Sequence, residues 1–317
     1  MDCAPAVIGR KALSKRAPEK CSEFGSTDFD ANASCGKAGS AKPIRIYTLG
    51  RFSLAIGGQP IGSDGKAKHR PLALLKTLIA LGGRCVASSQ VWECLWPDSE
   101  GDLGGRNLNI TVHRLRHMLQ ANAAVLQHDG KLTLNEQICW VDAWHFERLV
   151  NDGLRRLGEP VTADASELTL RTALGSYAGD FLARESEESW MLAPRLRLKT
   201  KFDRVVCALS THFEHQTRFA DAIDICLQAL EKDPLNELMY RRMMSCHLKQ
   251  GEFAGALRAY ACCREALAKG LSAPVSSETE RLHLEALRAT NASIAQTDKR
   301  APLLMIHRDS PQKQSLA

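Results

Sequence analysis

A short motif occurs twice in the second half of the chain, at 218–223 and again at 252–257, a spacing of 34 residues. Each copy has a phenylalanine followed by alanines, and the pair Asp233-Pro234 between the copies is suited to start a further helix. A period of 34 residues is typical of helix pairs that stack so that each buries its apolar face against a neighbour. The second half is therefore predicted to be an all-helical repeat.

Helical patterns also precede the repeat. We expect a helix that begins at Asp142, which can cap it, and further helices over 168–182 and 190–215. The large aromatic residues of this half fall at helical spacings and are expected in its core: Trp144, Phe146, Tyr177, Phe181, Trp190, Phe219 and Phe253.

The net charge of +6 is unevenly distributed. Residues 1–41 carry six basic and five acidic side chains, residues 42–131 carry twelve and six, and residues 132–317 carry 24 and 25. The excess therefore lies in 42–131. A basic segment joined to an electrically neutral one suggests a module that binds a polyanion.

The basic segment has the element order of a small α/β module. Alternating apolar residues predict strands at 44–49 and 52–56, and Pro71 is suited to the first turn of a helix that ends before Gly82. A second helix should run from Ser88 or Ser89 to the residue before Pro97. After a third helix, two short strands should flank Asp129-Gly130, a favoured hairpin turn.

The third helix, about 106–120, carries most of the functional information. Its apolar residues form one stripe that should be buried: Leu108, Val112, Leu115 and Leu119. The opposite face is expected to present Asn107, Ile110, Thr111, Arg114 and Met118, with Arg106, His113, Arg116 and His117 on the flanks. No acidic residue occurs between Leu103 and His128, so this face can approach phosphates without repulsion.

Two stretches resemble known families. The stretch 106–119 resembles the recognition-helix segment of OmpR/PhoB-type winged-helix DNA-binding domains. The second half resembles the bacterial transcriptional activator domain, through 141–147, 173–182, Trp190 and the repeat over 219–267. The combination, from about 44 to 287, resembles the SARP class of bacterial transcriptional activators. We find no receiver domain ahead of the winged helix, as in OmpR-type regulators, and no ATPase module behind the repeat, as in larger relatives, so the resemblance does not imply phosphorylation or ATP hydrolysis.

The predicted fold is mainly α: a winged helix-turn-helix with a small β-sheet and a wing, followed by an all-α tetratricopeptide-like repeat. We expect a flexible arm over 1–41, the winged-helix domain over 42–139, the activator domain over 140–288 and a flexible tail over 289–317. Eleven scattered cysteines without a Cys-x-x-Cys pair, and no apolar run long enough for a membrane span, favour a cytoplasmic protein.

These features predict a sequence-specific DNA-binding regulator. Asn, Thr and Arg hydrogen-bond base edges, so Asn107, Thr111 and Arg114 are candidates for base contact, with Ile110 against a thymine methyl group. Other basic residues are expected to hold the phosphates or, by the resemblance, to lie near the minor groove: Arg106, Arg116, His128 and Lys131. The resemblance also implies contact with RNA polymerase, for which the loop 97–105 is one candidate, and a homodimer on repeated DNA sites.

Other functions are less well supported. The rival is a tetratricopeptide-type interaction scaffold whose winged helix does not read DNA, and the acid-free third helix argues against it. His212 and His215 lack the glutamate and spacing of a zinc protease, and 62–66 lacks residues that a phosphate-binding loop requires. His113 and His117 have no carboxylate or cysteine nearby to complete a metal site. We therefore expect neither an enzyme nor a bound metal or cofactor.

Overall fold

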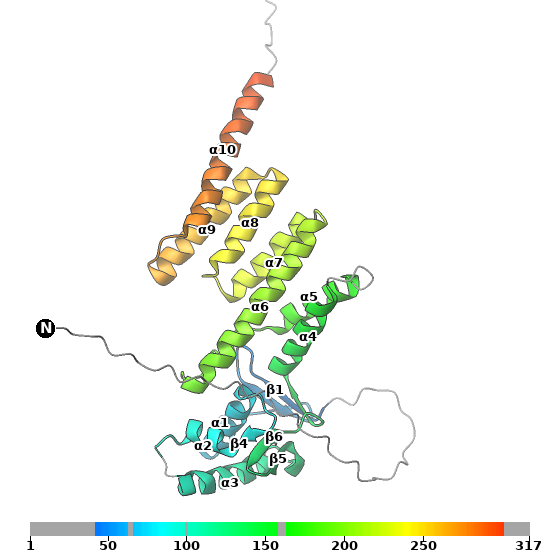
Figure 1. Ribbon diagram of the computed structural model, residues 1–317, viewed down its shortest axis with the longest axis vertical. Coiled ribbons are helices and arrows are strands. Elements are labelled where there is room, and N and C mark those ends of the chain that lie inside the picture. The colour runs from blue at the N-terminus through cyan, green and yellow to red at the C-terminus, as the bar shows by residue number, and fades with distance from the viewer. Residues whose placement is uncertain (1–41, 63–65, 99–100, 158–162, 301–317) are drawn as a thin grey trace, which may run out of the picture. The chain divides into compact units, whose positions relative to one another are not determined.

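The computed structural model describes residues 42–62, 66–98, 101–157 and 163–300. Within these ranges, two small sheets and three helices precede a series of seven helices (Figure 1). The predicted mainly α fold is confirmed. The predicted arm and the end of the predicted tail, from residue 301 onward, lie outside the described residues.

The first sheet has four strands in the order β3-β2-β1-β7. Its strands are β1 (Ile44–Tyr47), β2 (Ser53–Ile56), β3 (Gln59–Ile61) and β7 (Cys139–Val141). β1, β2 and β3 form antiparallel pairs, whereas β7 is parallel to β1, with Cys139 opposite Ile44. The predicted domain boundary between 139 and 140 therefore falls inside a strand that belongs to this sheet.

Three helices form the body of the first half: α1 (Lys66–Ala80), α2 (Ser88–Leu95) and α3 (Gly101–Met118). α1 begins five residues before Pro71, earlier than predicted, so the proline lies inside the helix. Because proline has no N–H group, the carbonyl of Ala67, four residues earlier, lacks its usual donor within α1. α3 also begins earlier than predicted, which leaves little of the expected 97–105 loop, of which residues 99 and 100 are not described.

The second sheet is the wing. β5 (Val125–His128) and β6 (Lys131–Leu134) form the predicted hairpin, and β4 (Val86–Ala87) pairs with the other side of β6. The turn residues Asp129 and Gly130 both have positive φ, of 46° and 68°, which is the geometry that a two-residue hairpin of this twist requires.

The second half is helical within the described residues, from α4 (Asp142–Arg156) onward. The helices that follow are α5 (Ala163–Ser176), α6 (Ser189–His215), α7 (Phe219–Lys232), α8 (Glu237–Gln250), α9 (Phe253–Leu271) and α10 (Ser277–Arg300). α7 and α9 begin at the two phenylalanines of the sequence repeat, which confirms the period. Successive helices from α6 to α10 pack against one another, as a helical repeat requires (Figure 1).

Two helix boundaries differ from the sequence predictions. The helix expected over 168–182 ends at Ser176, because the following residues join the first sheet: Phe181 bridges Leu49, and the N–H of Leu182 donates to the carbonyl of Thr48 at 2.8 Å. α10 runs to Arg300, so the predicted boundary at 288 lies within a helix rather than at the start of a tail.

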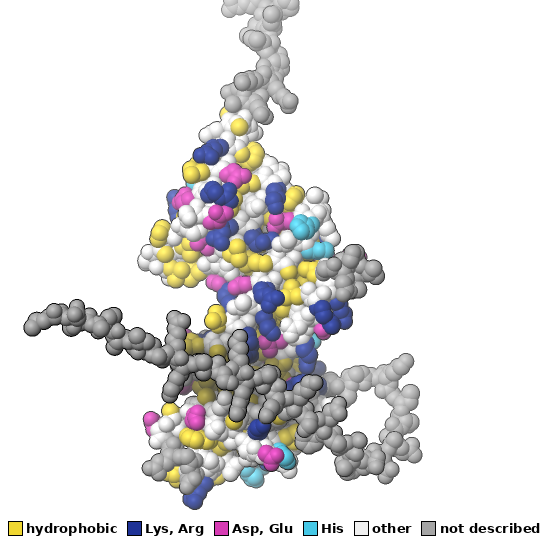
Figure 2. All heavy atoms as spheres, in the orientation of Figure 1, with side chains coloured by type: hydrophobic (Ala, Val, Ile, Leu, Met, Phe, Trp, Pro, Cys, Tyr) yellow, Lys and Arg dark blue, Asp and Glu magenta, His cyan; other side chains and the backbone are white. Residues whose placement is uncertain are grey.

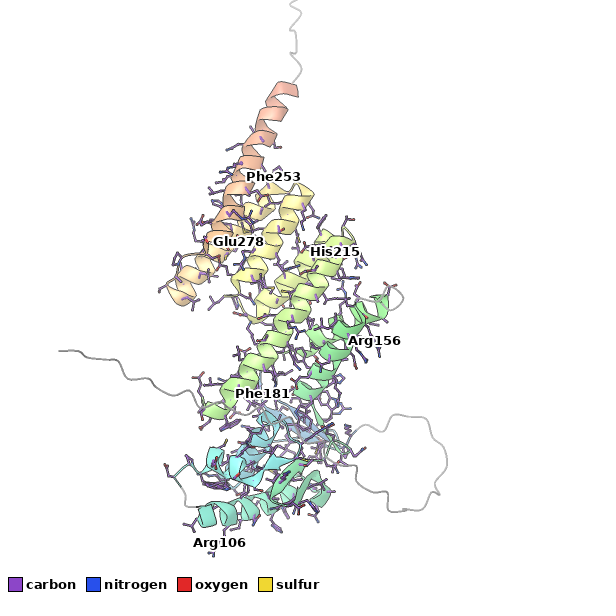
Figure 3. All side chains as sticks on the ribbon, viewed as in Figure 1. Arg106, Arg156, Phe181, His215, Phe253 and Glu278 are labelled. Atoms are coloured by element: carbon purple, nitrogen blue, oxygen red, sulfur yellow. The ribbon has the colours of Figure 1, made fainter. Side chains whose placement is uncertain are left out.

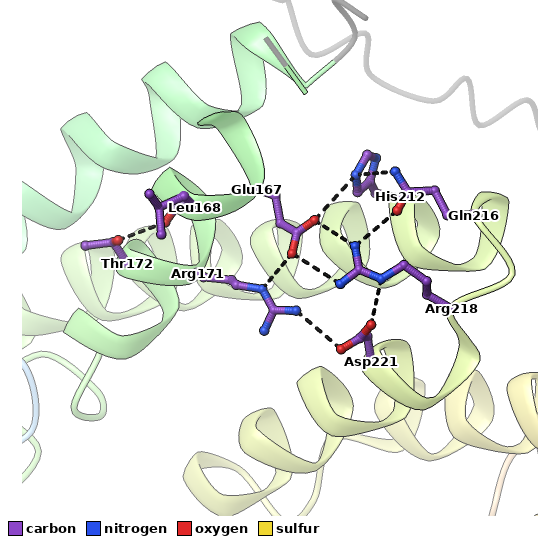
Figure 4. A network of polar contacts seen from close by, with 8 residues as sticks. All are labelled: Glu167, Leu168, Arg171, Thr172, His212, Gln216, Arg218 and Asp221. Atoms are coloured by element: carbon purple, nitrogen blue, oxygen red, sulfur yellow. Dashed lines mark hydrogen bonds and ion pairs between the residues drawn. The ribbon is translucent and has the colours of Figure 1, made fainter. Parts of the chain in front are cut away.

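A polar network joins α5, α6 and the start of α7 (Figure 4). Glu167 of α5 accepts hydrogen bonds from Arg171 at 2.9 Å and from Arg218 at 3.0 Å, and it lies 3.9 Å from His212. Arg218 also donates to Asp221 at 2.7 Å. Burial raises the pKa of Glu167, but the hydrogen bonds from the two arginines outweigh it and hold the pKa below its ordinary value.

The surface of the repeat helices carries charges of both signs. On the face in Figure 2, Lys and Arg side chains alternate with Asp and Glu over this part of the molecule, in keeping with its nearly equal numbers of basic and acidic residues. Among the described helices, none combines the length and the apolar character that crossing a membrane demands.

Candidate nucleic-acid interface

α3 is held in place by its predicted apolar stripe. Leu108, Val112, Leu115 and Leu119 are each at most 1% exposed. α3 packs against both α1 and α2, and a Cβ added at Gly104 would lie 2.9 Å from the ring of Trp92 in α2. The close approach of the two helices at Gly104 fixes the direction of α3, which turns its opposite face to solvent.

The outer face of α3 presents three of the five residues expected there, together with Arg106, which was expected on a flank; Met118 is half-buried. Arg106, Asn107, Ile110 and Arg114 are exposed, and Ile110 is 52% exposed despite its apolar side chain. Arg106 lies near the start of α3 on its outer side (Figure 3). Neither Arg106 nor Arg114 contacts a carboxylate within the described part of the chain. This face offers hydrogen-bond donors, one exposed isoleucine and the positive charges of Arg106 and Arg114.

Thr111 does not lie on this face, contrary to the sequence prediction that was the basis for its role in base contact. It is 4% exposed, and its hydroxyl donates to the carbonyl of Asn107 at 2.7 Å within the helix. With 100° of rotation per residue, Thr111 lies at the edge of the buried stripe, one turn from Leu108. A threonine hydroxyl that bonds the preceding turn of its own helix satisfies itself and needs no outside partner.

Arg116 has a structural contact that the sequence did not predict. It is half-buried, and its Nε donates to the carbonyl of Val125 in β5 at 2.9 Å. A second link joins the same elements, because Gln127 Nε2 donates to Asn109 Oδ1 at 2.9 Å. Arg116 therefore holds the wing against α3, and a phosphate can reach only the part of its guanidinium that stays exposed.

The wing tip presents His128 and Lys131, as predicted, and both are exposed. His128 Nδ1 lies 2.9 Å from Asp129 Oδ2, so the tip also carries an acidic group. Lys131 lies opposite Ala87, where β4 meets β6, and the N–H of Ser88 donates to the carbonyl of Gly130 at 2.8 Å. These bonds fix the wing to the start of α2.

Two histidines that the sequence analysis placed on the flanks of α3 belong to its outer face. His113 and His117 are exposed and lie close to the centre of the outer face of α3, together with Arg106 and Ile110. The sequence could have located both histidines on this face, if their angles had been counted at 100° per residue from the buried apolar stripe. Asn107 and Thr111, which the sequence analysis placed on the outer face, lie nearer to the buried apolar stripe than these two histidines do.

The fold is shared with a solved structure. No curated protein sequence matches the chain. The structure titled Mycobacterium tuberculosis EmbR in complex with a low-affinity phosphopeptide matches with a TM-score of 0.59 and 17% identity, over 82% of this chain and 70% of that chain. The TPR2B domain of yeast Sti1 in complex with an Hsp70 peptide covers 46% of this chain and 98% of that chain at 18% identity, and its TM-score of 0.29 is too low to carry an argument.

The second half also matches a protein family by sequence. Residues 141–287 match the family described as bacterial transcriptional activator domain, so the chain carries the domain of a transcriptional activator family. This match confirms the predicted resemblance of the second half to the bacterial transcriptional activator domain, and the match to EmbR shows a shared fold.

Proposed function

We propose that the chain is a sequence-specific DNA-binding transcription regulator that acts as an activator in the bacterial cytoplasm. The observation that carries the proposal is the exposed outer face of α3, which has no acidic residue after Leu103 and belongs to a winged helix joined to a bacterial transcriptional activator domain. An α-helix fits the major groove of B-form DNA, where arginine and asparagine can each form two hydrogen bonds to a base edge.

Each candidate residue has a role in this proposal. Asn107 and Arg114 contact base edges, and Ile110 packs against a thymine methyl group. Arg106, Lys131 and the exposed part of Arg116 hold phosphates, which set the register of the protein on the duplex. His128 lies near the minor groove at the wing tip.

The helical repeat supplies the protein contacts in this proposal. Stacked helix pairs expose surfaces suited to helices and peptides. We assign to this half the contact with RNA polymerase and the contact between two copies of the chain on repeated DNA sites. Two copies on adjacent half-sites would bind about one helical turn apart, roughly 10–11 base pairs.

Selection of bound fragments from genomic DNA tests the proposal. Purified protein should enrich a short element, and Arg114→Ala should weaken binding to it by about 1–3 kcal/mol and relax selection at one position. Arg45→Ala is the matched control, because it removes one exposed arginine of the same domain from β1 instead of α3. Fragments with no common element would contradict DNA reading and favour the interaction scaffold.

A further inference from the structure

A groove lies between the first turns of α1 and the C-terminal half of α3. Its volume is about 620 Å³, and it is open to solvent. The residues that line it come from these two helices only: Ala67, Lys68, Pro71, His113, Arg114, His117 and Met118. Arg114 belongs both to the groove and to the outer face of α3, so the groove is continuous with the face that we propose reads DNA.

The chemistry of the lining favours an anion. Four of the seven residues end in nitrogen groups, and none is a carboxylate. Neither α1 nor the α3 sequence after Leu103 contains an acidic residue. His113 and His117 are spaced for a metal ion, but the cationic side chains of Lys68 and Arg114 share the groove and would repel one. The two non-bridging oxygens of a backbone phosphate, in contrast, accept hydrogen bonds from nitrogen donors of this kind.

We propose that this groove holds a phosphate of the DNA backbone beside the segment that α3 reads, and the inference rests on the proposed function. Lys68, His113 and His117 donate to the phosphate, so that α1 contacts DNA as well as α3 and the wing. Inorganic phosphate has the same chemistry, but an open groove continuous with Arg114 suits a strand that passes from the outer face across α1. Asn107, Ile110 and Arg114 then select bases, and the contacts of Lys68, His113 and His117 help to fix the register.

The contact has a measurable electrostatic signature. Each phosphate neutralised on B-form DNA adds about 0.9 to the slope of log K against log salt concentration. Lys68→Ala should therefore reduce the slope by about 1 and weaken binding about eightfold near 0.1 M salt, equally for the selected element and for random DNA. Lys68→Arg should restore both values, because it retains the charge.

A double-mutant cycle, which combines a substitution in the protein with neutralisation of one phosphate in the DNA, identifies the phosphate that the groove binds. The full chain is titrated with duplexes in which single phosphates are replaced by neutral methylphosphonates, and the protein carries Lys68→Ala or the double change His113→Ala and His117→Ala. All three positions are exposed or half-exposed and helical, so alanine should leave the fold intact, which circular dichroism checks. Arg45→Ala again serves as the matched control of charge.

We expect one methylphosphonate position at which Lys68→Ala no longer weakens binding, and the same position for the histidine pair. If the protein selects an element but Lys68→Ala changes neither affinity nor salt slope, the inference fails while the proposed function stands. Failure to select any element would overturn the proposed function first. If inorganic phosphate shifts the NMR signals of His113 and His117 while Lys68→Ala leaves DNA binding unchanged, the groove takes a free anion and the strand assignment is wrong.

Discussion

Asp142 joins the first sheet to the helical half through a single buried carboxylate. It accepts hydrogen bonds from the N–H of Thr48 at 2.8 Å, the hydroxyl of Thr48 at 2.7 Å, the N–H of Leu49 at 2.9 Å and the N–H of Ala143 at 2.7 Å. Burial raises the pKa of this carboxyl, and the hydrogen bonds oppose the rise. From sequence Asp142 could be interpreted only as a helix cap, because Thr48 and Leu49 lie more than 90 residues away.

Asp142→Asn should reduce the free energy of unfolding by about 3 kcal/mol. The amide has one acceptor oxygen in place of two, so its NH2 group faces backbone donors and leaves them unsatisfied. Chemical denaturation followed by circular dichroism measures the loss. Asp152→Asn, at an exposed position of α4, should change the value little, and an equal effect of the two substitutions would show that the Asp142 contacts do not stabilise the fold.

Thr111→Ala should leave the selected DNA element unchanged, whereas Asn107→Ala should alter it. The buried Thr111 side chain contributes only packing and a bond within α3, so we expect a loss of stability of about 1 kcal/mol without a change in base preference. Fragment selection with both variants measures this. An altered element with Thr111→Ala would mean that α3 exposes this residue on DNA.

At the scale of elements, the sequence predicts those helices and turns whose position follows from a regular spacing of residues along the chain. The structure confirms the stripe from Leu108 to Leu119 and the Asp129-Gly130 turn, which follow from spacing within a few residues. It also confirms the starts of α7 and α9, which follow from the repeat of 34 residues. β4 and β7 have two and three residues, too few for a pattern, and they exist because distant strands pair with them. The groove beside α1 depends on the packing of two helices and has no local signal.

The Glu167 network should make the helical half sensitive to acid. The pKa of Glu167 is lowered in the fold, so its contribution to stability is fully present above its ordinary pKa of about 4.3 and is lost as the pH falls through the lower value. Glu167→Gln should reduce the free energy of unfolding by about 1 kcal/mol at pH 7, since its partners are partly exposed.

Denaturation of both proteins between pH 3 and pH 7 measures this difference. The difference in the free energy of unfolding between wild type and Glu167→Gln should become smaller below about pH 4. Glu265→Gln removes an exposed pair with Lys269 on α9 and serves as the control. A gap that stays constant with pH would show that the charge of Glu167 does not stabilise the fold.

At the scale of the molecule, the first sheet and the helical half share backbone hydrogen bonds. The N–H of Gly50 donates to the carbonyl of Asp180 at 2.8 Å, and the N–H of Ala183 donates to the carbonyl of Gly50 at 3.0 Å. Lys76 of α1 also pairs with Glu185 at 2.8 Å. The sequence predicts two separate modules because its charge and periodicity change near residue 140, and neither signal reports contacts between them.

Gly50→Ala should destabilise this junction by about 1–2 kcal/mol. Gly50 has a φ of +81°, and an added Cβ would lie 3.2 Å from the carbonyl oxygen of Ala178. Gly58→Ala is the matched control, because Gly58 has a φ of +85° and nothing within 4 Å of an added Cβ. Thermal unfolding followed at 222 nm should shift further for Gly50→Ala, as one transition. Equal shifts would mean that the contact with Ala178 contributes nothing.

The central claim is that the outer face of α3 recognises a DNA sequence and that the chain thereby brings its transcriptional activator domain to that site. The most direct test is the ratio of the dissociation constants for a random duplex and for the selected element, measured at one fixed salt concentration. Sequence-specific regulators show ratios of about 10³ or more, and we expect the wild type to fall in this range and Arg114→Ala well below it. A ratio near one for the wild type, with binding that salt abolishes, would contradict the account.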